Sequence, residues 1–244
     1  MGQVMVVTSG KGGTGKTTLC AGVASALSQQ GQRVLCIDAD IGLRNLDLAL
    51  GMADSATVAF TEVLAGRIPL ERAPAHPSLS SLWLLTAPTS AEEVDREAFR
   101  QMLDDAKARY DWILIDAPAG IGTGFQLSSA YADRALVVAT ADPASLRDAG
   151  RAAQLLRQNG MTLMHLAVNR VSRKLFQKIG STIDDVMDRI GLPLLGLVPE
   201  DPNVVLAAVM GAPLLRYTDR GAAVAMGNIA RRLMFESVPL MRIR

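Results

Sequence analysis

The chain has 244 residues, of which 49% are apolar and 20% charged, and its formal net charge is +1. This length suits one large α/β domain with a buried core, and a near-neutral chain has no overall field that attracts nucleic acid. Aromatic residues make up 4%, which argues against a stacking platform for single-stranded nucleic acid. No apolar run reaches the roughly 18 residues of a membrane span. Cys20 and Cys36 lie in apolar contexts typical of buried thiols in a reducing compartment, so we expect a cytoplasmic protein. From the net charge and the few aromatic residues we expect no nucleic acid partner.

Short apolar runs alternate with longer segments of helical character along the chain. The predicted strands are 3–9, 33–38, 81–87, 112–117, 134–140, 162–169 and 193–199, and the predicted helices are 16–29, 91–109, 144–158, 181–190 and about 217–236. Most of the strand runs are apolar on both faces, as in buried parallel strands. The alternation predicts a single α/β domain over residues 1–244, with a mostly parallel central sheet, helices on both faces and a short tail at 237–244.

The segment Gly10–Thr17 reads GKGGTGKT and lies between a predicted strand and a predicted helix. It fits the G-x-x-x-x-G-K-[ST] pattern of a phosphate-binding loop, so the predicted fold is that of a P-loop NTPase. Glycines let backbone N–H groups converge on phosphate oxygens. Lys16 would reach the β- and γ-phosphates, and the Thr17 hydroxyl would bind Mg²⁺. The expected cofactors are therefore ATP and Mg²⁺, and the predicted binding residues of the loop are Gly10, Lys11, Gly12, Gly13, Thr14, Gly15, Lys16, Thr17 and Thr18.

Two of the predicted strands end in acidic residues. Asp116 follows the apolar run WILI, where a Walker-B carboxylate would hold the magnesium shell. Asp38 and Asp40 end the run RVLCIDAD. Acids at strand ends are often only caps or turn residues. Since open α/β sheets bind ligands at the carboxyl ends of their strands, we interpret these acids beside a phosphate loop as functional.

The loop carries a second lysine, Lys11, upstream of Lys16. One Mg²⁺ and one lysine leave net negative charge around a triphosphate of charge about −4. A further cation about 4 Å away is worth on the order of 4 kcal/mol at an effective dielectric near 20, and some P-loop enzymes obtain that cation from another chain. Lys11 is either such a catalytic cation or a solvated lysine at the edge of the loop.

The loop with its second lysine resembles the deviant Walker A box of the ParA/MinD family of ATPases. The runs VTSGKGG (7–13), DADIGLRNLDLALG (38–51), DAPAGIGTGF (116–125) and GLVPEDPNV (196–204) are similar to this family as well. The resemblance covers nearly the whole chain, and segment 38–51 is most similar to the members that place the division septum. Gly122 is a departure, because members of the family usually carry Glu there.

The resemblance implies a homodimer when ATP is bound, with Lys11, Lys16 and Asp40 as catalytic residues. Lys11 would act on the phosphates of the partner subunit, and Asp40 would position or activate the attacking water. Thr17, Asp38 and Asp116 would form the metal side of the site, and Asn45 would be a switch residue near the γ-phosphate. The positions that match the base-binding region of the family are Asn169, Arg170, Pro199, Glu200 and Asp201.

The implied function is an ATPase switch that recruits a MinC-like division inhibitor to place the septum. Hydrolysis to ADP and phosphate would reset it, with help from a stimulating partner that is MinE-like or of another kind. Flagellar-number regulators and ParA-type partition ATPases share the loop and the dimer, so they remain alternatives. A metabolic ATP-dependent ligase of the same fold is a further alternative, although no extra domain is available to supply its substrate site.

The end of the chain departs from the family, whose members normally finish in a basic amphipathic helix that binds the membrane surface. Here the last predicted helix has an apolar stripe that would dock on the domain, formed by Ala222, Met226, Ile229 and Leu233. Beyond it Pro239 interrupts the short run VPLMRIR. Arg242 and Arg244 could contact anionic lipid. A tail packed on the domain and a peripheral contact with the inner face of the cell membrane are therefore both open.

Overall fold

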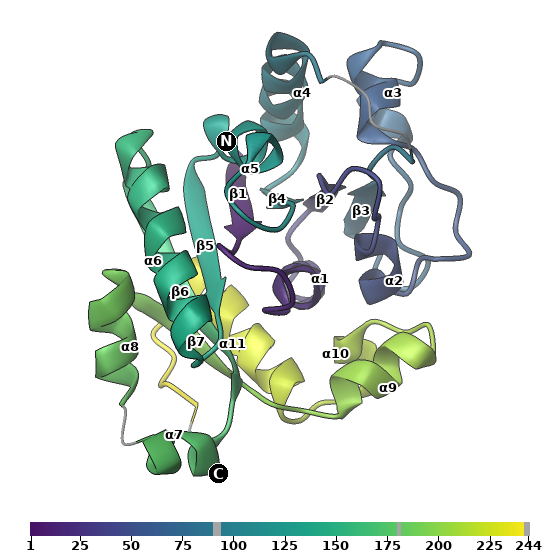
Figure 1. The fold of residues 1–244 in the computed structure, drawn as a ribbon. Coiled ribbons are helices and arrows are strands. Elements are labelled where there is room, and N and C mark those ends of the chain that lie inside the picture. The colour runs from purple at the N-terminus through teal and green to yellow at the C-terminus, as the bar shows by residue number, and fades with distance from the viewer. Residues whose placement is uncertain (90–93, 180–181, 242–244) are drawn as a thin grey trace.

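Parallel strands form the centre of the molecule (Figure 1). The computed structural model describes residues 1–89, 94–179 and 182–241, and over these ranges it has one seven-stranded parallel sheet in the order β3-β2-β4-β1-β5-β6-β7. The strands are β1 (Gln3–Thr8), β2 (Val34–Asp38), β3 (Leu82–Leu85), β4 (Trp112–Asp116), β5 (Arg134–Ala139), β6 (Leu163–Val171) and β7 (Leu194–Pro199). Their bounds differ from the predicted ones by about one or two residues at each end.

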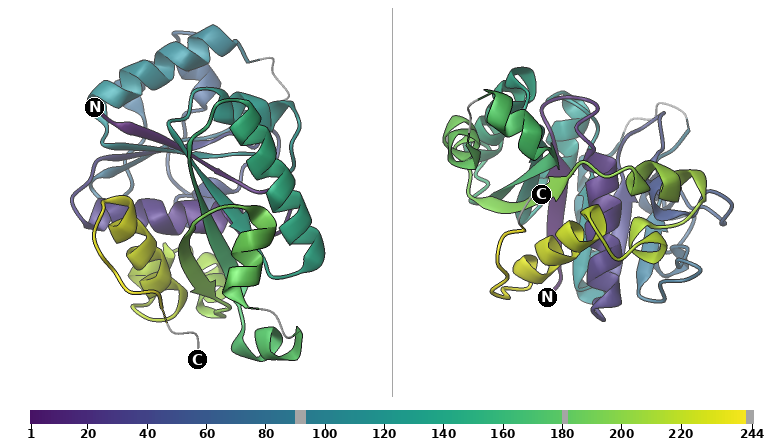
Figure 2. Two further views of the ribbon diagram at one scale, coloured as in Figure 1. Left: turned by 90° about the vertical axis from the view of Figure 1, so that its left-hand side faces the viewer. Right: turned by 90° about the horizontal axis from the view of Figure 1, so that it is seen from below.

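Helices cover both faces of the sheet, as Figure 2 shows. Within the described residues they are α1 (Lys16–Gln29), α2 (Leu46–Leu50), α3 (Phe60–Leu64), α4 (Arg96–Arg109), α5 (Thr123–Ala130), α6 (Pro143–Gln158), α7 (Arg173–Ile179), α8 (Ile183–Ile190), α9 (Asn203–Val209), α10 (Leu214–Tyr217) and α11 (Ala222–Leu233), with a short 3-10 helix at Leu70–Arg72. Consecutive residues of β1 serve opposite layers: Met5 and Val7 pack towards α1 and α11, whereas Val4 and Val6 pack towards α4 and α6. The predicted α/β fold of a P-loop NTPase is therefore confirmed.

Two predicted helices have different starts in the structure. Residues 91–93 of the helix predicted at 91–109 lie outside the described residues, and α4 begins at Arg96 because Asp95 accepts hydrogen bonds from the N–H groups of Glu97 and Ala98. The helix predicted at about 217–236 is present as α11, which runs only from Ala222 to Leu233, and Tyr217 ends the separate short helix α10. The helical conformation is interrupted before α11 at Gly221, which has a φ of 53°. Asp201 accepts a hydrogen bond from the first N–H of α11, that of Ala222.

The predicted apolar stripe of the last helix is buried, and α11 packs against α1 and β7. Arg232, near the end of α11, donates hydrogen bonds to the carbonyl oxygens of Val238 and Pro239 in the tail and to that of Leu195 in β7. The tail therefore lies along the domain as far as it is described. Arg242 and Arg244, on which the predicted lipid contact depends, lie outside the described residues. None of the helices in the described part of the chain has the length and apolar character needed to cross a membrane.

Candidate active site

The phosphate loop connects β1 to α1 at the carboxyl edge of the sheet. Gly13 and Gly15 have φ angles of 78° and 86°, in the left-handed region that favours glycine. Gly10 is required for a different reason, because a Cβ there would lie 2.0 Å from the carbonyl oxygen of Asp148 in α6. These glycines let the loop wrap tightly in front of the positive end of α1, which is the arrangement that binds phosphate.

Lys16 and Asp116 form a buried ion pair at the base of this loop. The Lys16 Nζ lies 3.1 Å from Asp116 Oδ1, and the two residues are only 7% and 1% exposed. Burial raises the pKa of Asp116 to about 6, although Lys16 and the Thr17 side chain, which hydrogen-bonds to Asp116, both act to lower it. In the absence of an anion, Asp116 thus neutralises a lysine that is already in place for a phosphate.

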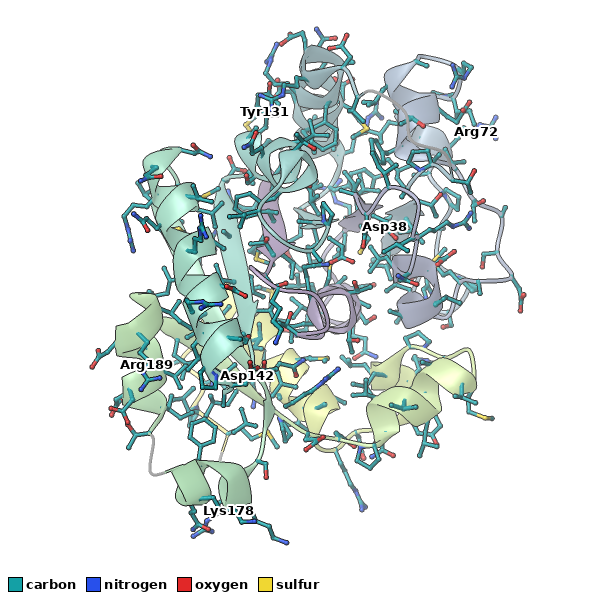
Figure 3. The ribbon with its side chains drawn as sticks, viewed as in Figure 1. Asp38, Arg72, Tyr131, Asp142, Lys178 and Arg189 are labelled. Carbon is teal, nitrogen blue, oxygen red and sulfur yellow. The ribbon has the colours of Figure 1, made fainter. Side chains whose placement is uncertain are left out.

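Asp38 ends β2 (Figure 3). It pairs with Asp116 in the register of β2 and β4 and is fully buried. Its Oδ1 accepts a hydrogen bond from the N–H of Asp40, and its Oδ2 accepts bonds from the N–H groups of Asn45 and Leu46. Burial raises the pKa of Asp38, and these three backbone bonds oppose the rise. Both oxygens therefore hold segment 39–46, on which Asp40 is half-buried and Asn45 exposed.

The predicted base-binding residues come together next to the loop. Pro199, Glu200 and Asp201 from the end of β7 and Asn169 and Arg170 from β6 line a cavity of about 400 Å³ that also includes Gly15 and Thr18. Sequence reasoning missed four further lining residues from the segments that follow: Pro202, Val204, Val205 and Met226. The charge-free apolar sequence of α9 was the available signal for a hydrophobic wall, but it carries no indication of which cavity it faces.

Two of the base-pocket residues also have structural partners. The side-chain amide of Asn169 donates to the Thr14 carbonyl oxygen at 2.8 Å, and its oxygen accepts a bond from the N–H of Arg170. A Cβ on Gly15 would lie 2.2 Å from the Asn169 nitrogen. Asn169 therefore ties the cavity to the phosphate loop. Asp201 holds the starts of α9 and α11 through Asn203 and Ala222, so neither of its oxygens is free to read a base.

Lys11 lies in surroundings unlike those of Lys16. Its side chain is 46% exposed and its Nζ lies 3.5 Å from Oδ1 of Asp142, beyond the end of β5. Its ion-pair partner is Asp142 rather than Asp38 or Asp116, so the structure places it at the rim of the site. In this single protomer Lys11 has the exposure expected of a lysine at the loop edge, and its action on a partner's phosphates stays a prediction.

The residues present fit a nucleotide that carries Mg²⁺. The loop supplies glycine backbone and a buried lysine for phosphate, and the Thr17 hydroxyl and Asp116 supply hard oxygen donors of the kind Mg²⁺ prefers. Asp38 fits a direct metal contact less well, because both its oxygens are already used by backbone N–H groups. No three His, Cys, Asp or Glu side chains in the described ranges gather into a metal cage, as expected where phosphate and water supply most ligands.

The family CbiA, described as the CobQ/CobB/MinD/ParA nucleotide binding domain, matches residues 5–214 of this chain. The chain belongs to this family. The resemblance drawn from the phosphate loop and from segment 38–51 is thereby confirmed. Nucleotide binding by the family agrees with the predicted cofactors. Residues 5–214 include every predicted site residue.

Relatives within the CbiA family include septum site-determining proteins. The protein MinD of Bacillus subtilis is 37% identical over 98% of this chain and 92% of its own length. The solved MinC:MinD cell division protein complex of Aquifex aeolicus contains a chain that is 38% identical, with a TM-score of 0.92 and 99% of both chains covered. The Pyrococcus horikoshii MinD, solved in complex with Mg-ADP, is 28% identical with a TM-score of 0.83 and 96% of each chain covered.

The alternative functions are not favoured by these likenesses. The ParA family ATPase of Chlorobium tepidum has a TM-score of 0.83 but only 22% identity, so its likeness shows the fold alone. Identity at or above 35% over nearly the whole chain is found instead with septum site-determining proteins from Bacillus, Synechocystis and Thermotoga. A MinD-like cell-division ATPase is therefore the function class that the comparisons support.

Proposed function

We propose that the chain is a MinD-like ATP-dependent switch that helps to place the division septum. The observation that carries the proposal is the contrast between its two loop lysines, one buried in the site with Asp116 and the other turned outward to Asp142. A single protomer then has one loop lysine in the phosphate site, and its second loop lysine lies outside that site, although a second cation favours transfer of a phosphoryl group. The function class comes from the MinD relatives, and the proposal adds a role for each residue of the site.

ATP would bind with its phosphates in the glycine loop and its base in the cavity beside Asn169. Lys16 would exchange Asp116 for the β- and γ-phosphates, which is favourable because the nucleotide brings several negative charges to a site with little access to water. Mg²⁺ held by Thr17 and supported by Asp116 would neutralise charge on the phosphate oxygens. Asp38 would act by fixing the position of segment 39–46, and Asp40 on that segment would orient the attacking water.

Dimerisation follows from the position of Lys11. Without a γ-phosphate, moving each Lys11 from its own Asp142 towards the partner's site brings two ammonium groups together with too little negative charge to offset them, which is unfavourable. With ATP in both sites, each Lys11 gains an anionic partner on the neighbouring protomer, so the dimer is stabilised by the ligand that it contains. Hydrolysis removes that partner charge, and the dimer dissociates.

The output of the switch would be recruitment of a partner. The Aquifex complex pairs a MinD chain with MinC, and we infer that a MinC-type inhibitor binds this chain when ATP is present. A further protein, MinE-like or of another kind, would stimulate hydrolysis, and the tail would allow peripheral contact with the membrane surface. Affinity capture of the purified inhibitor, expected with ATP and absent with ADP, tests this part of the proposal.

The decisive test is the variant Lys11→Ala. We expect it to bind ATP with an affinity within about threefold of the wild type, because its side chain lies outside its own site. We expect its ATP-dependent dimer to weaken by at least about 100-fold, because two charge contacts are lost per dimer. Sedimentation velocity with ATP and Mg²⁺, in an Asp40→Ala background that slows turnover, measures the monomer and the dimer.

A matched control removes a lysine of equal charge elsewhere. Lys178 lies on the exposed surface of α7, so the variant Lys178→Ala should leave the dimer dissociation constant unchanged. An unchanged dimer fraction in Lys11→Ala, with ATP still bound, would contradict the proposal, because the dimer would then form without Lys11.

A further inference from the structure

We propose that a second cavity of this chain, at the edge of the sheet opposite the phosphate loop, binds a small organic anion that carries a flat apolar group. The cavity has a volume of about 550 Å³, which is in the range of small-molecule sites and exceeds that of the cavity beside Asn169. It lies where β1, β2 and β4 begin and where α11 ends, and its lining includes Gln3, Arg33, Trp112 and Phe235. Binding there is independent of the proposed switch.

Arg134, the first residue of β5, supplies a buried positive charge at the wall of this cavity. The residue is only 8% exposed. Its Cζ lies 5.4 Å from the centre of the Trp112 ring and 5.5 Å from the centre of the Phe235 ring, and both rings line the cavity. Its Nε donates a hydrogen bond of 3.1 Å to the side-chain oxygen of Gln3, which is a third lining residue. The guanidinium therefore lies directly behind three residues that face the cavity.

The two terminal nitrogens of Arg134 are the unused donors at this site. Within the described ranges no carboxylate forms an ion pair with Arg134, and Gln3 is the acceptor of its guanidinium. Neither terminal nitrogen belongs to the fully buried side-chain atoms without a partner, which in the described chain are the hydroxyls of Thr8 and Thr14, so both can be reached from outside. Burial and the charge of Arg134 together lower the pKa of His165 on the neighbouring strand. Arg134 thus has both donors and positive charge available for an anion.

Two acids at this edge of the sheet are already matched by other cations. Asp111 lines the cavity, and Arg33 holds it with two hydrogen bonds, of 3.2 Å from Nε and 2.8 Å from Nη2. Asp133 accepts a hydrogen bond of 2.8 Å from the Nζ of Lys107, another lining residue. Arg134 therefore leaves a positive charge that neither acid offsets, and an anionic ligand would complement it.

Phe235 gives the cavity an exposed aromatic wall. The residue is 84% exposed, and its φ of 64° lies in the left-handed region that glycine usually occupies just after a helix. The end of α11 holds this strained conformation, because the N–H groups of Phe235 and Glu236 donate to the carbonyl oxygens of Arg232 and Arg231. The ring is thereby kept over Arg134. A flat apolar group that packs against this ring would bring its acidic substituent close to the guanidinium.

The test uses anilinonaphthalene sulfonate (ANS), a flat aromatic sulfonate whose fluorescence rises in apolar surroundings. With Mg-ADP at saturation to fill the cavity beside Asn169, we expect ANS to bind saturably at one site per protomer. The uncharged analogue N-phenylnaphthylamine lacks the sulfonate and should bind at least about tenfold more weakly, because it cannot accept charge-assisted hydrogen bonds from Arg134. Equal affinity for the two probes, or binding of ANS at several equivalent sites, would overturn the proposal.

Two variants link the binding to these side chains. Arg134→Gln removes the charge and should weaken ANS binding by at least about tenfold. Phe235→Gly removes the ring and should weaken it by about fivefold, and this variant should stay folded because glycine suits the left-handed φ of the position.

The matched control is Arg151→Gln, which removes an exposed arginine from α6 and should leave the affinity for ANS unchanged. An unchanged affinity for Mg-ADP would show that each variant is folded. If Arg134→Gln does not fold, Phe235→Gly decides the question alone. Wild-type affinity for ANS in folded Phe235→Gly or in folded Arg134→Gln would show that ANS binds elsewhere and that the cavity is not the site.

Discussion

At the scale of single residues, the phosphate loop contains a buried hydroxyl that has no hydrogen-bond partner. Thr14 is buried, and its Oγ1 is one of two such side-chain atoms in the described part of the chain. An unsatisfied buried hydroxyl costs about 1–3 kcal/mol. Because phosphate loops bind their ligand through backbone N–H groups, we expect the Thr14 hydroxyl to be dispensable for phosphate binding.

Thr14→Val should therefore stabilise the protein without harming nucleotide binding. The side chains have nearly the same shape, so we expect the free energy of unfolding to rise by about 1 kcal/mol and the melting temperature by about 2–4 °C. ATP affinity from isothermal titration calorimetry should stay within about twofold. A tenfold loss of affinity would mean instead that the hydroxyl is itself a nucleotide ligand.

Sequence reasoning named the candidate residues of the site but not the contacts that the structure shows between them. The loop pattern singled out Lys16, and the strand-end rule singled out Asp116, but only the sheet order brings together two residues that are 100 positions apart. The same rule found Asp38 without showing that its oxygens bind the backbone of segment 39–46. The partner of Lys11 was not predicted, because Asp142 looks in sequence like an ordinary helix cap.

At the scale of secondary-structure elements, His76 holds the end of the short helix α2. Its Nε2 lies 2.7 Å from the Leu50 carbonyl oxygen at the end of α2, and its Nδ1 accepts bonds from the N–H groups of Ser78 and Leu79. This pattern requires a neutral ring with its proton on Nε2. Burial accordingly lowers the pKa of His76 from its usual value of 6.5.

His76 should make the folded protein less stable in mild acid. The unfolded chain binds a proton on this ring near pH 6.5, whereas the folded protein does so only at lower pH. The stability present above about pH 6.5 is thus lost as the pH falls, by up to about 1 kcal/mol at pH 5.5. Urea unfolding at pH 7.5 and 5.5 measures the loss, and His76→Gln should show a smaller one. An identical pH slope in the variant would contradict this assignment.

Elements with strong periodic signals were predicted well, and those defined by tertiary contacts were not. The strands are apolar on both faces, so their runs are distinct from the surrounding helices. The start of α11 is marked by Gly221 and by a bond from Ala222 to Asp201, and no local pattern encodes a partner 21 residues away. The short helices α2, α3 and α9 lack a full amphipathic repeat and were therefore missed.

At the scale of the whole molecule, nucleotide binding should stabilise the fold. A ligand at about 100 times its dissociation constant contributes about 2.7 kcal/mol, which for a chain of this size corresponds to roughly 5–10 °C in melting temperature. We expect ATP with Mg²⁺ to raise the melting temperature by this amount in differential scanning fluorimetry. Removal of Mg²⁺ with EDTA should reduce the shift, and Lys16→Ala should abolish it. A full shift in Lys16→Ala would place the nucleotide elsewhere.

Both outer strands of the sheet are covered by the chain itself. On one side, residues 74–76 bond to β3 through the pairs Leu84 to Pro74 and His76 to Leu82. On the other, Arg232 uses its guanidinium to join the carbonyl oxygen of Leu195 in β7 to the tail. Exposed strand borders are the usual route by which sheet proteins add to one another and form fibres. With these borders protected, a rise in the local concentration of the protein carries little danger of runaway polymerisation.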